Sequence, residues 1–149
     1  GCGANTILFA AAAGSLDGRA AYAVAESPYA SFHQEASHIL WSRYRLPEFP
    51  FLTLMGWKLD HDGLGFTSGD MELSAALSGK DCSVPVLFLS SAEDAYIPVE
   101  QTQAAYDLYS GPKEQLQGGA GHGTVVISCQ EELQAMLAQW NGQYVDAGG

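Results

Sequence analysis

The sequence predicts an α/β fold with about three parallel strands and flanking helices. Segments typical of strands alternate with segments typical of helices along the 149 residues, which favours a parallel sheet joined by helical crossovers. The clearest strand is Val84–Ser91, "VPVLFLSS", because it is apolar and β-favouring, as in a strand buried on both faces. The apolar fraction of 47% is enough for a core, and the length suits one domain.

The first part of the chain predicts a helix, a strand and a second helix. Gly3–Gly14 is rich in alanine and apolar nearly all round, so we expect a buried helix that stops at Gly14. The short apolar run Ala20–Glu26 is typical of a strand in a parallel sheet. Pro28 suits the first turn of the next helix, which should run to about Tyr44.

The middle of the chain has a weaker pattern. Arg45–Gly69 contains Pro47 and Pro50 and shows no clear periodicity, so we expect irregular structure there. The segment "GDMELSAALSG" that follows predicts a short helix, with Asp70 as its N-cap.

Three further elements are expected after the buried strand. Pro98 opens a helix that the Gly111-Pro112 pair ends. The segment "KEQLQ" is a weak strand candidate that leads into "GGAGHG". Ser128 and Glu131 have the spacing of a capping box, followed by apolar residues at helical spacing, which predicts a final helix.

Composition excludes several classes of partner. Six Lys and Arg stand against 17 Asp and Glu, a net charge of −11, whereas nucleic acids and anionic membranes attract basic patches. No apolar run reaches the roughly 18 residues of a membrane span, and "ANTILFAAAAG" lacks the basic residues that begin a signal peptide, so we expect a cytoplasmic protein. The cysteines and histidines show no ligand spacing, so no metal or cofactor is expected.

Two residues that suit acid–base chemistry follow neighbouring strands. Asp94 lies just beyond the strand Val84–Ser91, and His122 lies in the glycine-rich loop after the next strand candidate. The carboxyl ends of parallel strands meet at one sheet edge, where sites of open α/β sheets form. There an Asp can hold the Nδ1 proton of a His and leave Nε2 free as a base. Each residue alone also fits an ordinary surface turn.

The same region resembles a known family. "PVLFLSSAEDAYIPVEQTQAAYDLYSGPKEQLQGGAGHG" is similar to the acid strand, helix and base loop of α/β-hydrolases, in the bacterial branch related to serine aminopeptidases and esterases. "VAESPYASF" resembles the strand and turn after that family's nucleophile helix. The resemblance covers nearly all of the chain. It implies a partial α/β-hydrolase fold, a small-molecule acyl substrate, and Asp94 and His122 as the acid and base of a Ser-Asp-His triad.

The resemblance also implies a missing nucleophile. "GANT" looks like the segment that starts at the last glycine of the G-x-S-x-G elbow, which places Gly1 at the position of the serine. The backbone N–H of Cys2 would then help to form the oxyanion hole. We therefore expect residues 1–149 to be the C-terminal portion of one hydrolase domain. Two alternatives stay open: Cys2 as the nucleophile, and a non-catalytic relative that serves in binding or regulation.

Residues 32–69 correspond to a cap in this resemblance, because "SRYRLPEFPF" looks like the start of the family's cap region. Trp41, Phe49, Phe51 and Trp57 would line an acyl pocket, or would pack the cap on the core. The strand Ala20–Glu26 would lack the neighbour that carries the nucleophile. We expect such an open apolar edge to promote self-association.

Overall fold

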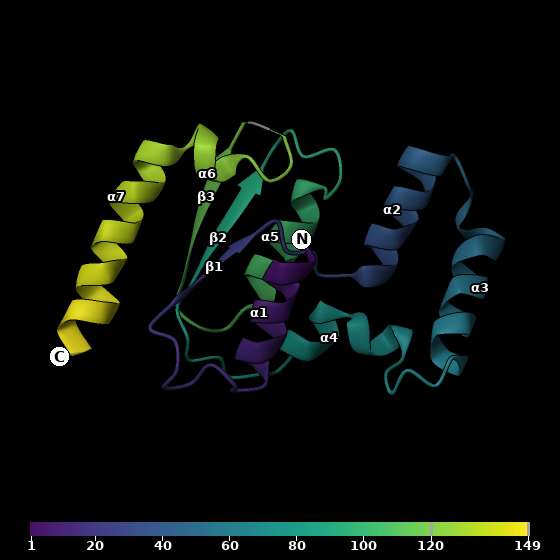
Figure 1. Ribbon diagram of the computed structural model, residues 1–149, viewed down its shortest axis with the longest axis horizontal. Helices are drawn as coiled ribbons and strands as arrows, with labels where there is room; N and C mark the ends of the chain where they lie inside the picture. Colours follow the sequence, from purple (N-terminus) through teal and green to yellow (C-terminus); the bar gives the residue numbers. More distant parts are fainter. Residues whose placement is uncertain (120, 149) are drawn as a thin grey trace.

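In a computed structural model that describes residues 1–119 and 121–148, three parallel strands form one sheet. They are β1 (Ala23–Glu26), β2 (Val86–Ser91) and β3 (Lys113–Gly118), in the order β1-β2-β3 (Figure 1). The predicted α/β class is confirmed, and each strand falls within or next to the segment where the sequence predicts it.

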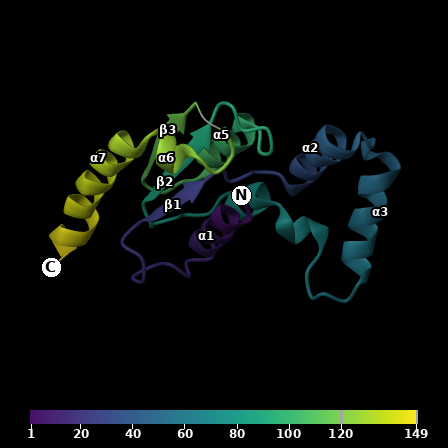
Figure 2. The same cartoon turned by 45° about the horizontal axis from the view of Figure 1, so that its top comes forward.

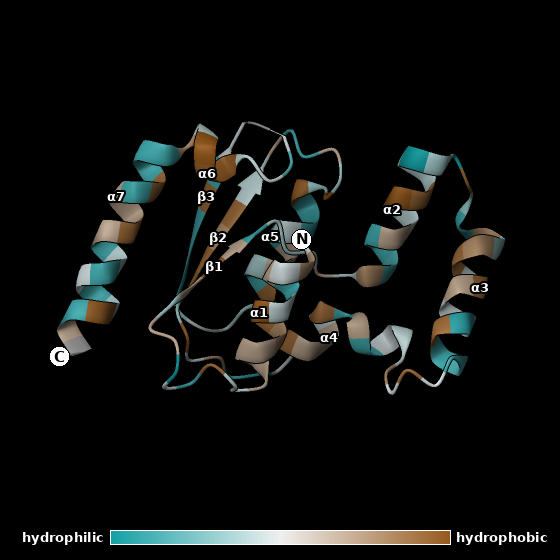
Figure 3. Ribbon diagram, in the orientation of Figure 1, coloured by the Kyte–Doolittle hydropathy of each residue, from teal (hydrophilic) through white to brown (hydrophobic). Residues whose placement is uncertain are grey.

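The central strand β2 is buried on both faces, as predicted. Phe88 faces a core shared with Leu8, Leu73 and Tyr109, whereas Leu87 packs on the opposite face. All six residues of β2 are buried. Figure 3 shows this strand as a largely hydrophobic ribbon at the centre of the molecule. The sheet is therefore covered from two sides, which is why its middle strand needs no polar face.

Two groups of helices provide this cover. The first face carries α1 (Cys2–Ala12), α4 (Leu73–Leu77) and α5 (Val99–Leu108), whose residues join the core around Phe88. The opposite face carries α6 (Val125–Ser128) and α7 (Gln130–Trp140). A π turn, Asn141–Val145, and a 3-10 turn, Asp146–Gly148, follow α7. None of the helices in the described residues is both long and apolar enough to cross a membrane.

Much of the segment 45–69, expected to be irregular, forms a helix that pairs with the predicted helix before it. α2 (Phe32–Tyr44) and α3 (Glu48–His61) pack against each other and stand to one side of the sheet in both views (Figures 1 and 2). The prediction for 45–69 is wrong because both prolines lie where a helix tolerates them. Pro47 is the N-cap of α3, and Pro50 follows Phe49, whose φ of −92° and ψ of 133° are not helical. The regular part of the helix therefore begins at Pro50, a position that requires no backbone N–H.

The helix after β1 begins later than predicted. Its N-cap is Ser31, whose Oγ accepts a hydrogen bond from Gln34 N at 3.2 Å. Pro28 does not open the helix, because the next residue is held by another element. Tyr29 N donates to Asn5 Oδ1 and Tyr29 O accepts from Asn5 Nδ2, both at 2.9 Å. This pairing keeps the chain extended until Ser31.

Two predicted caps also differ. Asp70 is not an N-cap but the third residue of a 3-10 turn, Ser68–Met71, that Thr67 caps; its carboxylate accepts from Thr67 N at 2.7 Å. The Ser128–Glu131 capping box does not form. Ser128 ends α6, and α7 begins at Gln130 after Cys129, so the serine lies one position too early to cap α7.

Candidate active site

The carboxyl ends of the strands bring an acid and a base together. Asp94 follows β2 and His122 follows β3, and His122 Nδ1 lies 2.7 Å from Asp94 Oδ2. A carboxylate only accepts hydrogen bonds, so the ring nitrogen facing it is the donor and Nε2 of a neutral imidazole is left without a proton. The predicted proximity of these two side chains is thus present in the structure.

Asp94 is held as a buried carboxylate. Its side chain is 1% exposed, and Oδ1 accepts hydrogen bonds from Tyr96 N and Ile97 N, each at 2.9 Å. Burial alone would raise the pKa of Asp94, but the hydrogen bonds from Ile97, His122 and Tyr96 outweigh it and hold the pKa below its ordinary value. The carboxyl therefore stays ionised beside the imidazole.

A third strand end also reaches this carboxylate. Ser27 directly follows β1, is buried, and its Oγ lies 3.1 Å from Asp94 Oδ2 as donor. Its φ of 48° lies in the left-handed region, which is unusual for a residue with a side chain. No sequence pattern marks Ser27, because its partner lies on a separate strand.

The loop that carries His122 is tied to the sheet and turns sharply. Gly123, the next residue, has a φ of 70°, a conformation that favours glycine. Glu26 Oε1, at the end of β1, accepts from Val125 N at 3.1 Å. The rings of His122 and Tyr96 lie 5.3 Å apart between centroids. These contacts leave the His122 side chain 37% exposed, so the base is supported by the loop and still reachable.

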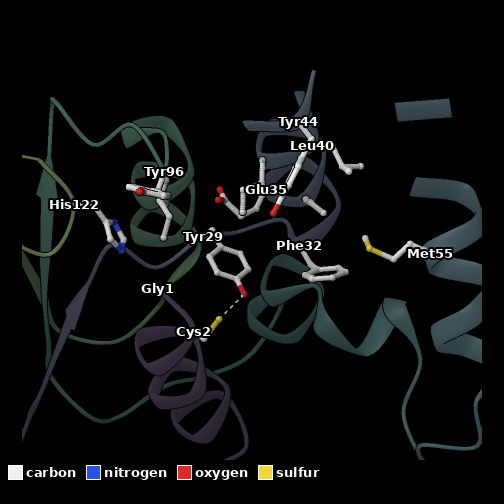
Figure 4. A pocket seen from close by; sticks show the side chains of 13 residues that line it. Gly1, Cys2, Tyr29, Phe32, Glu35, Leu40, Tyr44, Met55, Tyr96 and His122 are labelled. Carbon is white, nitrogen blue, oxygen red and sulfur yellow. Dashed lines mark hydrogen bonds between the residues drawn. The ribbon is translucent and has the colours of Figure 1, made fainter. Parts of the chain in front are cut away.

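His122 faces a cavity of about 530 Å³ between the sheet edge and the α2–α3 hairpin. Gly1 and Cys2, at the start of α1, lie on its wall, so the structure brings the predicted nucleophile position to the same space as the base. Most of the remaining wall is apolar, and Figure 4 shows its labelled side chains. The lining comprises Gly1, Cys2, Tyr29, Phe32, Glu35, Ala36, Ile39, Leu40, Tyr44, Met55, Tyr96, Ile97 and His122.

The four aromatics expected at the pocket do not line this cavity. Trp41, Phe49, Phe51 and Trp57 are 59%, 75%, 42% and 62% exposed. Aromatic character suggested a pocket, but the rotation of the two hairpin helices decides which side chains face inward. The inward positions belong to other apolar residues, among them Phe32, Leu40 and Met55.

Cys2 presents two different groups to the site. Its backbone N–H lies in the first turn of α1, where N–H groups have no intrahelical acceptor. Its Sγ lies 3.6 Å from Tyr29 Oη, and burial is the main cause that raises the pKa of that tyrosine. This N–H suits a donor to an oxyanion, because it has no intrahelical acceptor and lies at the positive end of the α1 helix dipole, which stabilises negative charge.

One charged side chain on the cavity wall went unnoticed in the sequence. Glu35, on the inner side of α2, is 5% exposed, and neither carboxylate oxygen has a hydrogen-bond partner in the described residues. Burial raises the pKa of Glu35; His38 opposes the rise and Asp94 adds to it. Within residues 1–119 and 121–148, no three Asp, Glu, His or Cys side chains gather as a metal site would require.

Comparison with known proteins gives one sequence relative and several structural ones. No family model matches the chain. The uncharacterised protein YqkD of Bacillus subtilis (strain 168) is 35% identical over 111 residues, which are 74% of this chain and 35% of YqkD. The esterase Pf2001 of Pyrococcus furiosus matches with a TM-score of 0.56 and 15% identity, over 92% of this chain and 50% of the esterase.

A second fold match is DcsB, whose structure was solved in complex with its substrate analogue. It aligns with a TM-score of 0.54 and 20% identity, over 95% of this chain and 62% of DcsB. The chain therefore spans about half the length of the esterase and about a third of YqkD. At these identities the solved structures establish the fold.

Proposed function

We propose that this chain, which has part of the α/β-hydrolase fold, supplies the acid and the base of a serine hydrolase that cleaves ester, thioester or small amide bonds. The observation that carries the proposal is the 2.7 Å contact between His122 Nδ1 and Asp94 Oδ2 beside an apolar cavity. The match to an esterase fold supports it. In this function the α2–α3 hairpin is the cap over the acyl group.

The geometry suits general base catalysis. Asp94 holds the Nδ1 proton, so His122 Nε2 accepts the proton of a serine hydroxyl while the serine oxygen bonds to the acyl carbon. His122 then gives this proton to the leaving alcohol, thiol or amine as the acyl–heteroatom bond breaks. Water, activated by the same nitrogen, releases the acid and regenerates the serine.

The nucleophile is the part that this chain does not supply. Gly1 has no side chain, so we propose that a serine upstream of Gly1, in a longer protein, acts as the nucleophile. The N–H of Cys2 would then stabilise the tetrahedral oxyanion, an interaction whose loss typically costs about 100-fold to 1,000-fold in kcat. Cys2 Sγ lies within hydrogen-bond distance of Tyr29 Oη and is not paired with His122. This favours an upstream serine over Cys2 as the nucleophile.

The test compares the 149-residue chain with the whole protein on 4-nitrophenyl butyrate. The chain should be no faster than free imidazole, whereas the whole protein should turn over and lose about 10³-fold or more in kcat on His122→Ala. His61→Ala is the control, because that ring lies on α3 and bonds to Trp57 O. Turnover by the chain that Cys2→Ala abolishes would assign the nucleophile to Cys2. A whole protein without turnover would favour a binding or regulatory domain.

A further inference from the structure

Glu35 is a buried carboxyl without a hydrogen-bond partner in the described residues. It is a carboxyl, 5% exposed, on the wall of a mostly apolar cavity, and both of its oxygens are unpartnered in the described residues. Buried carboxylates normally have hydrogen-bond or charge partners, because an unpaired one loses its hydration without compensation. A side chain kept in this state on a cavity wall points to a partner that enters the cavity.

We propose that Glu35 binds a protonated amine, so that the cavity selects acyl compounds that carry an ammonium group. This inference deepens the proposed function and rests on it for the role of the cavity as the acyl site. It assigns to Glu35 the part of a specificity-determining residue, separate from the acid and the base.

The chemistry of the wall favours a cation over other ligands. An ionised carboxylate accepts hydrogen bonds and cannot donate them, and an ammonium group offers three donors and the opposite charge. No lysine or arginine is among the described residues that line the cavity. The N-terminal ammonium of Gly1 also lies on the wall and interacts with Glu35 electrostatically, but it donates its hydrogen bonds to Glu26 O at 2.7 Å and Ser27 O at 2.5 Å. The net charge of −11 and the nearby Asp94 carboxylate repel an anionic ligand.

The titratable groups around Glu35, besides the Gly1 ammonium, are His38, Asp94, His122 and Tyr29, and each has another partner. His38, three residues along α2, has its Nε2 3.2 Å from Ala95 O and is engaged there. Asp94 and His122 act on Glu35 electrostatically from the strand edge, and they bond to each other. The Tyr29 hydroxyl faces Cys2 Sγ. None of these groups donates a hydrogen bond to the Glu35 carboxylate.

The placement of Glu35 also fits a substrate that reaches His122. Glu35 projects from α2 and His122 from the loop after β3, and both line the same cavity. Figure 4 shows the Glu35 carboxylate turned toward the side where Tyr96 and His122 lie. A short molecule can therefore set its ammonium against Glu35 and its acyl carbon toward the base.

The test measures binding of unreactive probes to the 149-residue chain, so it does not depend on catalysis. Hexylammonium, 1-hexanol and hexanoate are titrated at pH 8 by calorimetry, and NMR shifts of the Tyr96 and His122 rings locate the bound probe. Hexylammonium should bind about tenfold more tightly than hexanol, as expected for a charge-assisted hydrogen bond. Hexanoate should bind more weakly than hexanol.

Two variants separate a local effect from the overall charge. Glu35→Gln should bind hexylammonium and hexanol equally, whereas Glu100→Gln removes the same charge from an exposed position on α5 and should keep the tenfold preference. If Glu35→Gln fails to fold, the probe comparison in the unaltered chain decides alone. Equal affinity of the unaltered chain for hexylammonium and hexanol, or shifts away from the cavity, would overturn the inference. An amine preference in a protein without hydrolysis would instead refute only the proposed function.

Discussion

Ser27 Oγ donates a hydrogen bond of 3.1 Å to Asp94 Oδ2, the same oxygen that receives His122 Nδ1. The two residues are 67 positions apart and stand at the ends of adjacent strands. Ser27 adopts a left-handed φ of 48°, a backbone conformation that a residue with a Cβ enters at a cost. The hydrogen bond therefore helps to orient the Asp94 carboxylate, and Ser27 makes this bond from a strained backbone conformation.

Ser27→Ala and Ser27→Gly should differ in stability. The alanine variant loses a hydrogen bond to a charged group, worth about 1.5–3 kcal/mol, and keeps the strained backbone. The glycine variant loses the same bond but relieves the left-handed conformation, so it should be more stable than the alanine variant by about 1 kcal/mol. Urea unfolding of both variants measures the difference. An alanine variant as stable as the unaltered chain would mean that the Ser27–Asp94 bond contributes nothing.

Asp94→Asn should change the tautomer of His122. In the unaltered chain the carboxylate can accept only, so the neutral ring should carry its proton on Nδ1. An asparagine amide can also donate, which allows the proton to move to Nε2. Long-range ¹H–¹⁵N NMR of neutral imidazole reports the tautomer directly. His61 serves as the internal control, and an unchanged His122 spectrum would show that the two side chains are not partners in solution.

Glu35→Gln should stabilise the chain increasingly as pH rises. Burial raises the pKa of Glu35 above its ordinary value of 4.5. The stability that this carboxyl contributes is therefore fully present below about pH 4.5 and is lost as the pH rises through the folded-state pKa. Glutamine does not ionise, so the variant avoids this loss. The free energy of unfolding at pH 4 and pH 8 tests the sign.

The informative quantity is the difference between Glu35→Gln and the unaltered chain, because other titrating groups cancel in it. That difference should be larger at pH 8 than at pH 4. Glu100→Gln, on the exposed side of α5, should show no such growth. A difference that stays constant between the two pH values would contradict a buried, unpaired carboxyl at position 35.

The open edge of β1 should let the 149-residue chain self-associate. β1 pairs only with β2 in the described sheet, and Ala23 N and Ser27 N donate to that neighbour. By alternation, the N–H of Val24 points to the outer edge, where it can pair with another chain. Light scattering after size exclusion should show a mass that rises with concentration.

Val24→Pro is the matched test, because it removes the outward N–H without breaking a bond to β2. It should reduce the association, provided that a thermal melt shows a folded chain. The opposite edge strand, β3, begins with Lys113 and Glu114, charged residues of the kind that discourage edge pairing. A monomeric unaltered chain at all concentrations would refute the prediction and the expectation of an incomplete sheet.

The sequence by itself determined the fold class and the pair of candidate catalytic residues. β2 was predictable because its apolar, β-favouring residues Val86 to Leu89 are typical of a strand that a parallel sheet buries on both faces. Asp94 and His122 were predictable because each lies in the loop after a strand, and parallel strands end at the same edge. Both inferences need only local pattern and the topology that the pattern implies.

Tertiary structure alone decided what surrounds this pair. The α3 helix was not predicted, because proline usually interrupts a helix. Proline is tolerated at a helix start, and only the structure shows that Pro47 and Pro50 lie there. The cavity wall and Glu35 depend on how α2 and α3 are rotated against the sheet edge, and the Ser27–Asp94 bond joins residues 67 positions apart. Side-chain direction and long-range contact arise from packing of the whole chain, and residue order along one segment does not encode them.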